Sequence, residues 1–286
     1  GVDGRLVAEN YWIFSVLCAL VAGVTVLICV MGTRSVIPRL PQGSAGSKFS
    51  WGDPIKDLKL AFTNRNFRIS TGASLAFGMS AGVYTTLALY LGTYFWEFSS
   101  KQLAGMILPA AIATLAAFVV LNKLGKRFDK PKLLSAFCLI LAVNSIWFIG
   151  ARLLGLLPGN EHPIIYPLLL LNTGIGVFAI VGMQVIGMSM AADIIDEQEA
   201  QTGKRQEGVV FAAGAFVAKT TTGIGAFIAG IVIDVSGIQG DSLPGSVDDG
   251  VLQTLGWFTL VMTGALALIA CFFYTRLKLG RDDHRK

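Results

Sequence analysis

Seven long apolar segments dominate this chain and restrict the folds that it can adopt. They lie at about 10–32, 69–96, 103–122, 133–156, 164–190, 209–235 and 251–275. A run of about 20 apolar residues spans the hydrocarbon core of a bilayer as an α-helix. Only 14% of the residues are charged, against about 25% in a soluble domain. Because the short alternating strands of membrane barrels are also missing, the sequence predicts an all-α polytopic membrane protein.

The basic residues are concentrated in alternate connections between these segments. Of the 23 Lys and Arg residues, nineteen fall in 33–68, 123–132, 191–208 and 276–286. Arg5, Lys101 and Arg152 lie in the other connections, and Lys219 lies inside a segment. Cytoplasmic loops of membrane proteins carry such an excess of Lys and Arg. We therefore expect residue 1 outside the cytoplasm and the C-terminus inside, and the net charge of +5 requires no nucleic-acid partner.

The order of the segments predicts three parts. Residues 1–33 hold one span, residues 34–68 form a cytoplasmic linker, and residues 69–286 hold six spans and a tail. The linker begins with a stretch rich in Pro, Gly and Ser, and continues at 56–69 with charged and apolar residues in the pattern of an amphipathic helix on the membrane surface. Many transporters join two six-helix halves by a long loop. We therefore expect helices six to twelve of a twelve-helix transporter, with five spans of the N-terminal half before Gly1.

Small residues predict where helices approach one another closely. GMSAG at 78–82 is a GxxxG motif, and Thr222, Ala226 and Gly230 repeat a small residue every four positions in the sixth segment. Small side chains allow the backbones of membrane helices to come into contact. Both patterns are therefore expected to face other helices.

Lys219 lies about ten residues into the segment 209–235, close to the middle of a bilayer. A charge at that depth costs at least about 2.5 kcal/mol on insertion scales, and the side chain is too short to reach the interface. Such a residue usually marks a functional site that faces a cavity. The alternative is a structural role, in which Lys219 pairs with one buried acid and joins two helices. No acid of this sequence lies at the same depth.

Other polar residues inside the segments are further candidates. Gln184 and Tyr84 are expected either at a binding site or in hydrogen bonds between helices, and Thr222 lies one turn from Lys219. For Asn144 and Asn172 we favour hydrogen bonds across helices.

A charged stretch follows the fifth apolar segment. It contains Asp193 and Asp196, then Thr202, Arg205 and Glu207. Acidic and basic side chains in one interfacial loop can form charge-assisted hydrogen bonds that differ between two conformations. A solvated loop that merely ends the two spans is the alternative, and the physical argument alone leaves both open.

The stretch 190–219 resembles the glycoside–pentoside–hexuronide:cation symporters, the melibiose-carrier-like branch of the major facilitator superfamily. The family pattern is Asp-x-x-Asp at the end of helix ten, a Thr-Gly-x-Arg-x-Glu-Gly turn, and a lysine on helix eleven. The matching positions here are Asp193, Asp196, Thr202, Gly203, Arg205, Glu207, Gly208 and Lys219. A weaker similarity covers the amphipathic stretch 56–69 and the basic loop 121–132.

The resemblance implies cation-coupled transport of a sugar or sugar-like solute with Na⁺ or H⁺, by alternating access, in the bacterial inner membrane. From their place in the apolar segments, Gln184, Tyr84 and Thr222 are candidate residues of the substrate site. The resemblance implies that Lys219 lies in the central cavity, near the substrate and cation sites. It also implies a cytoplasmic gate of Asp193, Asp196, Thr202, Arg205 and Glu207. No cofactor is expected, and the carboxylates that bind the coupling cation are expected mainly in the N-terminal half. Gln184 stands where sugar-carrying members have an aromatic residue, so the substrate itself stays open.

Two other functions compete with this interpretation. A transporter of a lipid or another amphipathic solute on the same scaffold is the first. A membrane-embedded enzyme or a sensor is the second, but the only histidines are His162 and His284. The four cysteines lack metal-ligand spacing, and no nucleophile–base pair is recognisable. We therefore predict that the protein is not an enzyme and holds no metal.

Overall fold

The computed structural model describes residues 8–39, 52–203, 206–238 and 245–279. The chain divides into two units, residues 1–53 and residues 54–286. In the first unit, α1 (Ala8–Thr33) continues into a 3₁₀ turn, Arg34–Arg39. Residues Tyr11–Pro38 of this unit are long and apolar enough to cross a membrane.

The second unit contains all the other helices of the described ranges. They are α2 (Asp53–Ala61), α3 (Arg65–Tyr90), α4 (Ser100–Gly105), α5 (Ile107–Arg127), α6 (Lys130–Leu153), α7 (Ile165–Thr202), α8 (Glu207–Ser236) and α9 (Asp249–Thr275). A π-helical turn, Leu91–Phe95, extends α3. Six of these segments are long and apolar enough to span a membrane, and α1 is the seventh in the described chain. The seven expected spans are therefore confirmed.

Two boundaries differ from the sequence prediction. The amphipathic stretch predicted at 56–69 is broken at Phe62–Asn64. A new helix begins there, because the side chain of Asn64 caps it by accepting a hydrogen bond from the backbone N–H of Phe67 at 2.9 Å. The second difference is the end of α7. This helix continues to Thr202, whereas the apolar segment predicted from the sequence ends near residue 190. Asp193 and Asp196 therefore lie towards the end of this helix, as the resemblance implies, and the turn between α7 and α8 is short.

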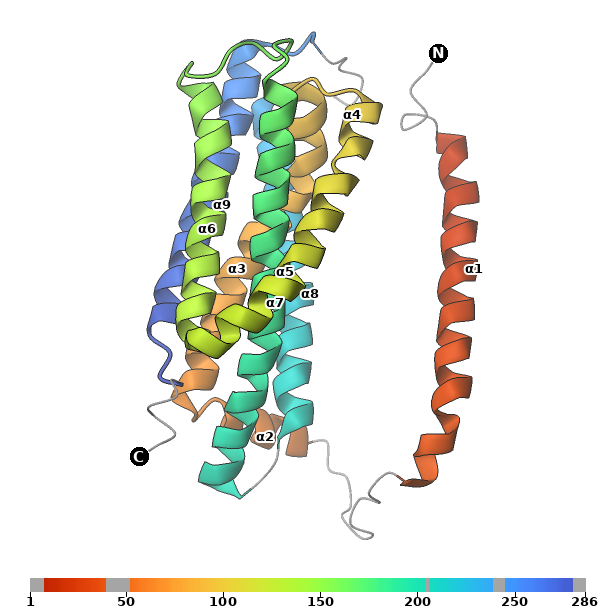
Figure 1. Cartoon of the computed structure of the whole chain (residues 1–286), viewed down its shortest axis with the longest axis vertical. Helices are drawn as coiled ribbons and strands as arrows, with labels where there is room; N and C mark the ends of the chain where they lie inside the picture. Colours follow the sequence, from red (N-terminus) through yellow and green to blue (C-terminus); the bar gives the residue numbers. More distant parts are fainter. Residues whose placement is uncertain (1–7, 40–51, 204–205, 239–244, 280–286) are drawn as a thin grey trace. The chain divides into compact units, whose positions relative to one another are not determined.

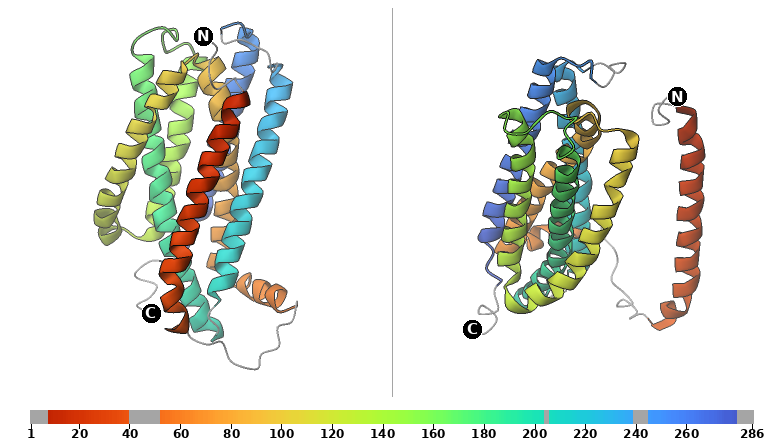
Figure 2. Two further views of the ribbon diagram at one scale, coloured as in Figure 1. Left: turned by 90° about the vertical axis from the view of Figure 1, so that its right-hand side faces the viewer. Right: turned by 45° about the horizontal axis from the view of Figure 1, so that its top comes forward.

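The long helices of the second unit pack side by side in an order that differs from their order in the chain (Figures 1 and 2). The helix α3 packs against α8 and α9, α6 packs against α9 and α7, and α5 packs against α7. The sequence of neighbours is thus α8, α3, α9, α6, α7, α5. Contact between α7 and α8 is limited, and α3 and α7 do not pack closely against each other.

The closest approach joins α3 to α8. A Cβ atom built on Gly225 would lie 2.5 Å from the carbonyl carbon of Gly82, and one built on Gly78 would collide with Thr221. The GMSAG motif therefore lies at a helix contact, as expected from the sequence. On α8, however, the contact uses Thr221, Gly225 and Ala229, which are buried. The predicted stripe of Thr222, Ala226 and Gly230 is displaced by one residue from this contact and is exposed.

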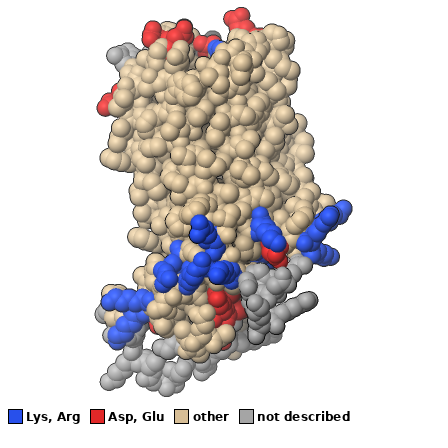
Figure 3. Space-filling view, turned by 90° about the vertical axis from the view of Figure 1, so that its left-hand side faces the viewer, with Lys and Arg blue, Asp and Glu red and all other residues tan. Residues whose placement is uncertain are grey.

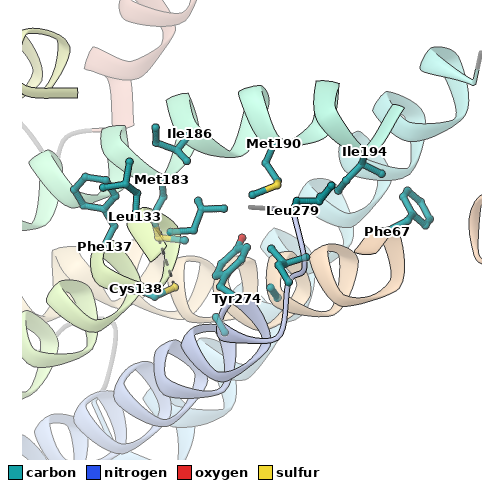
Figure 4. Packing of buried hydrophobic residues seen from close by; sticks show 14 of the residues in the cluster. Phe67, Leu133, Phe137, Cys138, Met183, Ile186, Met190, Ile194, Tyr274 and Leu279 are labelled. Carbon is teal, nitrogen blue, oxygen red and sulfur yellow. Dashed lines mark hydrogen bonds between the residues drawn. The ribbon is translucent and has the colours of Figure 1, made fainter. Parts of the chain in front are cut away.

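Two clusters of buried apolar side chains hold the bundle together. One lies towards the start of α3 and the end of α7, and includes Phe67, Phe137, Met190 and Tyr274 (Figure 4). The other surrounds Trp96 at the opposite end, where the rings of Trp96 and Phe148 stack with centroids 4.2 Å apart. The space between α3 and α7 runs from one cluster towards the other.

The two ends of this unit differ in charge, and Figure 3 shows an uncharged band between them. We call the end that carries α2, the α5–α6 turn and the α7–α8 turn the basic end. Its described basic residues include Lys56, Lys59, Arg65, Arg68, Lys123, Lys126, Arg127, Lys130, Lys132, Arg276 and Lys278. The opposite end carries Glu97, Glu161, Asp248 and Asp249 beside Lys101 and Arg152.

A single added methyl group tests the contact between α3 and α8. Gly225→Ala places a Cβ against the backbone of α3, so the helices must separate, and we expect the unfolding temperature in detergent to fall by several degrees. Gly230→Ala on the same helix is the control, because nothing lies within 4 Å of its Cβ position. Equal unfolding temperatures for the two variants would show that the close approach is not needed for stability.

Candidate functional site

A cavity of about 740 Å³ lies between α3, α7 and α8. Its walls extend from Phe67 to Thr85 along α3, from Met183 to Ile194 along α7, and from Val210 to Thr222 along α8. The cavity therefore occupies the half of the unit nearer the basic end and reaches its middle. Its volume falls in the range of roughly 300–1,000 Å³ found for small-molecule sites.

The lining of this cavity is mainly apolar, with uncharged polar groups from α3, α7, α8 and α9. The apolar part includes Phe77, Phe211 and Met188. The polar lining residues are Ser70, Thr71, Ser74, Thr85, Gln184, Thr221, Thr222 and Tyr274. Among the described residues that line the cavity, none is acidic or basic. Hydroxyl and amide groups of this kind can both donate and accept hydrogen bonds, so the lining suits a neutral solute with several polar groups.

Gln184 and Thr222 both lie in this lining, on opposite walls. Gln184 is exposed, and no hydrogen bond of its side chain is present within the described ranges. The Thr222 hydroxyl donates to the carbonyl oxygen of Ala218 at 2.8 Å, which leaves its oxygen free to accept.

Lys219 lies at the edge of the cavity and not in its wall. Twelve residues, about 18 Å of helix, separate it from Glu207, and 17 residues, about 26 Å, separate it from Ser236. Its neighbours one turn away, Ala215 and Thr222, line the cavity, and an offset of four residues rotates Lys219 by about 40° from Ala215. The side chain is exposed, and nothing in the described part of the chain pairs with it. The structural alternative, an ion pair with an acid of this chain, finds no support there.

Tyr84 lies in a second cavity of about 290 Å³, nearer the opposite end. Phe77 and Ala81 of α3 line both cavities, so the two adjoin along α3. The structure thus brings Gln184 and Thr222 together and places Tyr84 in the neighbouring space.

Asn144 and Asn172 form the predicted bridge between helices. The side-chain amide of each donates to the backbone carbonyl oxygen of the other, at 3.1 and 2.9 Å, and joins α6 to α7. Both side chains are buried beside the second cavity. Pairing satisfies polar groups that would be costly to bury alone, so the prediction of hydrogen bonds across helices is confirmed.

Asp193 forms an ion pair with a residue that the sequence did not suggest. The ammonium group of Lys130, at the start of α6, lies 2.6 Å from a carboxylate oxygen of Asp193 and also donates to the carbonyl oxygen of Ser189 at 3.3 Å. Both side chains are partly buried. The pair therefore joins α6 to α7 at the basic end.

The other residues of the charged stretch lie around the α7–α8 turn. Asp196 is exposed on α7, and Glu207 is the first residue of α8. The Thr202 hydroxyl donates to the carbonyl oxygen of Gln198 at 2.7 Å within α7. Arg205 lies outside the described residues.

Glu197 accepts hydrogen bonds from two asparagines at this end. The side-chain amide of Asn64 donates to it at 3.1 Å, and that of Asn66 donates at 3.0 Å. Asn66 also accepts a hydrogen bond from the backbone N–H of Lys278, after α9. Glu197 thus links α7, the corner between α2 and α3, and the segment after α9. The helix-capping preference of Asn could have indicated Asn64, but no sequence pattern indicates that Glu197 is its partner.

Two buried glutamines, Gln198 and Gln206, lie near the hydrogen bonds of Glu197. Gln198 is 1% exposed, and among the described residues neither its amide nitrogen nor its amide oxygen has a hydrogen-bond partner. Gln206 donates to the carboxylate of Asp57 at 3.3 Å, while no described residue donates to its own amide oxygen. A buried amide that stays unsatisfied costs about 1–3 kcal/mol, so these two side chains add less to stability than the Glu197 links.

Comparison with known proteins gives a consistent result. The family model described as MFS/sugar transport protein matches residues 2–281. An uncharacterized symporter of Synechocystis is 29% identical over 199 residues, which cover 66% of this chain and 34% of that protein. An isoprimeverose transporter of Lactiplantibacillus pentosus is 24% identical, over 63% of this chain and 36% of its own length. A candidate glycoside/cation symporter of Escherichia coli is 25% identical, over 62% and 36%. The matches thus span about a third of these relatives.

Replacing one carboxylate oxygen by an amide group tests the role of Glu197. In Glu197→Gln the new NH₂ group faces the NH₂ groups of Asn64 and Asn66, so at least one hydrogen bond is lost and two donors oppose each other. We expect the free energy of unfolding to fall by roughly 2 kcal/mol. Glu161→Gln, an exposed site at the opposite end, removes the same charge and should leave the unfolding temperature unchanged. A Glu197→Gln variant as stable as the Glu161→Gln control would exclude this role.

Proposed function

Because this chain belongs to the MFS/sugar transport protein family, we propose that it is the C-terminal half of a cation-coupled symporter. Its resemblance to the glycoside–pentoside–hexuronide:cation symporters agrees with the family model and with the named relatives. The whole protein would carry a sugar or sugar-like solute together with Na⁺ or H⁺ by alternating access. The observation that carries the proposal is the uncharged cavity between α3, α7 and α8, whose mainly apolar lining includes hydroxyl and amide groups, with Lys219 at its edge near mid-membrane.

The exposed side chains of α8 support the presence of a second helical bundle that covers this helix. Lys219, Phe216 and Phe227 are all exposed on this helix, the two rings by 71% and 70%. A charge at this depth needs a partner or water, which an N-terminal bundle facing α8 would supply. In this arrangement α1 is the last helix of the N-terminal half, and residues 34–68 connect the two halves. The absence of acids from the described cavity lining supports a cation site mainly in that half.

The charge difference between the two ends supports an orientation in the membrane. We assign the basic end to the cytoplasm, with residue 1 on the outside, in a bacterial inner membrane. The cavity between α3, α7 and α8 then faces the cytoplasmic half of the bilayer.

Substrate would bind at the interface of the two halves. Lys219, Gln184 and Thr222 would contact it from the larger cavity, and Tyr84 would contact it from the adjoining one. The cytoplasmic gate would include Asp193, Asp196, Thr202, Arg205 and Glu207. The Lys130–Asp193 pair and the Glu197 links make the basic end of α6, α7 and α3 move as one body while the halves rock.

The function of Lys219 can be tested in the whole transporter, obtained by extending the coding sequence upstream of Gly1. Lys219→Ala should reduce uptake of the solute at least tenfold, without loss of the protein from the membrane, because a charge at the edge of the cavity near mid-membrane is removed. Lys101→Ala, at the opposite end, is the control and should transport normally. Normal uptake by Lys219→Ala would remove the lysine from the mechanism.

The apolar part of the cavity favours a second candidate, a transporter of a lipid or another amphipathic solute. Phe77, Phe211 and the methionines of α7 offer a wide apolar wall. Competition distinguishes the two candidates: a sugar transporter is inhibited by excess unlabelled glycoside, whereas a lipid transporter is inhibited by a lysolipid and not by the glycoside.

A further inference from the structure

The short helix α2 exposes its apolar face. Ile55, Leu58 and Phe62 recur at spacings of three and four residues and are exposed by 59%, 38% and 41%. On the other side, Ala61 is fully buried and Asp57 bonds to Gln206. The polar and buried contacts thus face the bundle, and three large apolar side chains face away from it.

The position of α2 explains how such a face can exist in a membrane protein. Figure 2 shows α2 at the basic end, lying across the direction of the long helices and extending outward beside α8. A helix at this place lies near the level where the hydrocarbon core meets the headgroups. Apolar residues on one side of such a helix insert into the boundary between headgroups and acyl chains.

Basic residues surround the exposed apolar face. Lys56 and Lys59 lie on α2 itself, and Arg65 and Arg68 lie just after it on α3. All four are exposed. The guanidinium group of Arg68 also donates to the carbonyl oxygen of Phe62 at 2.9 Å, which holds the corner between α2 and α3. This combination of charges and apolar residues is complementary to a bilayer surface with anionic lipids.

Hydrogen bonds join α2 to the α7–α8 turn. Asp57 accepts from the amide of Gln206 at 3.3 Å, and Gln206 precedes the first residue of α8. Asn64, after α2, donates to Glu197 on α7. Because the Asp57–Gln206 hydrogen bond joins α2 to the residue before α8, a contact that keeps α2 in place also restrains the start of α8.

We propose that α2 and the following corner bind anionic phospholipid, and that this contact stabilises the α7–α8 turn through Asp57 and Asn64. The occupant of the exposed face is the lipid surface, and its acidic headgroups are bound by Lys56, Lys59, Arg65 and Arg68. The inference concerns the membrane contact and does not depend on which solute is carried.

The first experiment measures where the exposed face lies. The chain, with its four cysteines replaced by alanine, carries a spin label at Leu58→Cys, or at the exposed position Thr63→Cys as a control. It is placed in nanodiscs of phosphatidylcholine mixed equally with phosphatidylglycerol. We expect the ratio of oxygen to nickel-chelate accessibility to be several-fold higher at position 58 than at position 63. Equal ratios, or protection of position 58 from both reagents by a protein contact, would overturn the proposal.

The second experiment measures whether anionic lipid stabilises the chain more than neutral lipid does, and whether this effect depends on Gln206. The unfolding temperature of the native chain should be several degrees higher in the mixed nanodiscs than in phosphatidylcholine alone. Lys56→Glu/Lys59→Glu should lose most of this difference, whereas Lys101→Glu at the opposite end should keep it. Gln206→Ala should keep the label at position 58 in lipid but reduce the temperature difference. No difference between the two lipids in the native chain, or an equal loss in Lys101→Glu, would contradict the assignment.

Discussion

At Gly82 and Gly225 the backbones of α3 and α8 come into contact, because neither residue has a side chain to keep them apart. Membrane helices gain little from hydrophobic burial against each other, so close packing of this kind carries much of their association. The contact fixes α8 beside α3, while α6 and α7 are held on the other side through α9. The cavity between α3, α7 and α8 follows from this arrangement, since α3 and α7 pack closely against other helices of the second unit and not against each other.

Some polar residues of the described helices join one helix to another, whereas Lys219 does not. Asn144 and Asn172 satisfy each other, and Asp193 pairs with Lys130, so these groups hold helices together. Lys219 differs from them, because its side chain is exposed at the depth where a charge is most costly. A charge that is exposed at this depth, with no partner among the described residues of its own bundle, is expected at a surface that another part of the protein covers. The contrast supports a functional assignment for Lys219 and a structural one for the asparagines.

The basic end combines strong and weak links. Glu197 accepts hydrogen bonds from Asn64 and Asn66, whereas Gln198 and Gln206 have amide atoms with no partner among the described residues. Well-satisfied and less well-satisfied polar side chains therefore lie close together where α7 ends and α8 begins. In a transporter that changes the access of its site, such a place can rearrange at low cost while the bundle itself stays intact.

The sequence by itself determined the class of this protein, since lengths of apolar residues and the placement of basic residues depend only on the thickness and charge of a bilayer. It also indicated the GMSAG contact, the asparagine bridge and the candidate residues of the motif from Asp193 to Lys219. Only the tertiary structure decided which face of α8 packs, because Thr221–Gly225–Ala229 and Thr222–Ala226–Gly230 are equally small. It also decided the partners of Asp193 and Glu197, which are distant in the chain, and the separation of Tyr84 from Gln184. Helical periodicity gives the spacing of residues on one helix, whereas contacts between helices depend on how all six pack together.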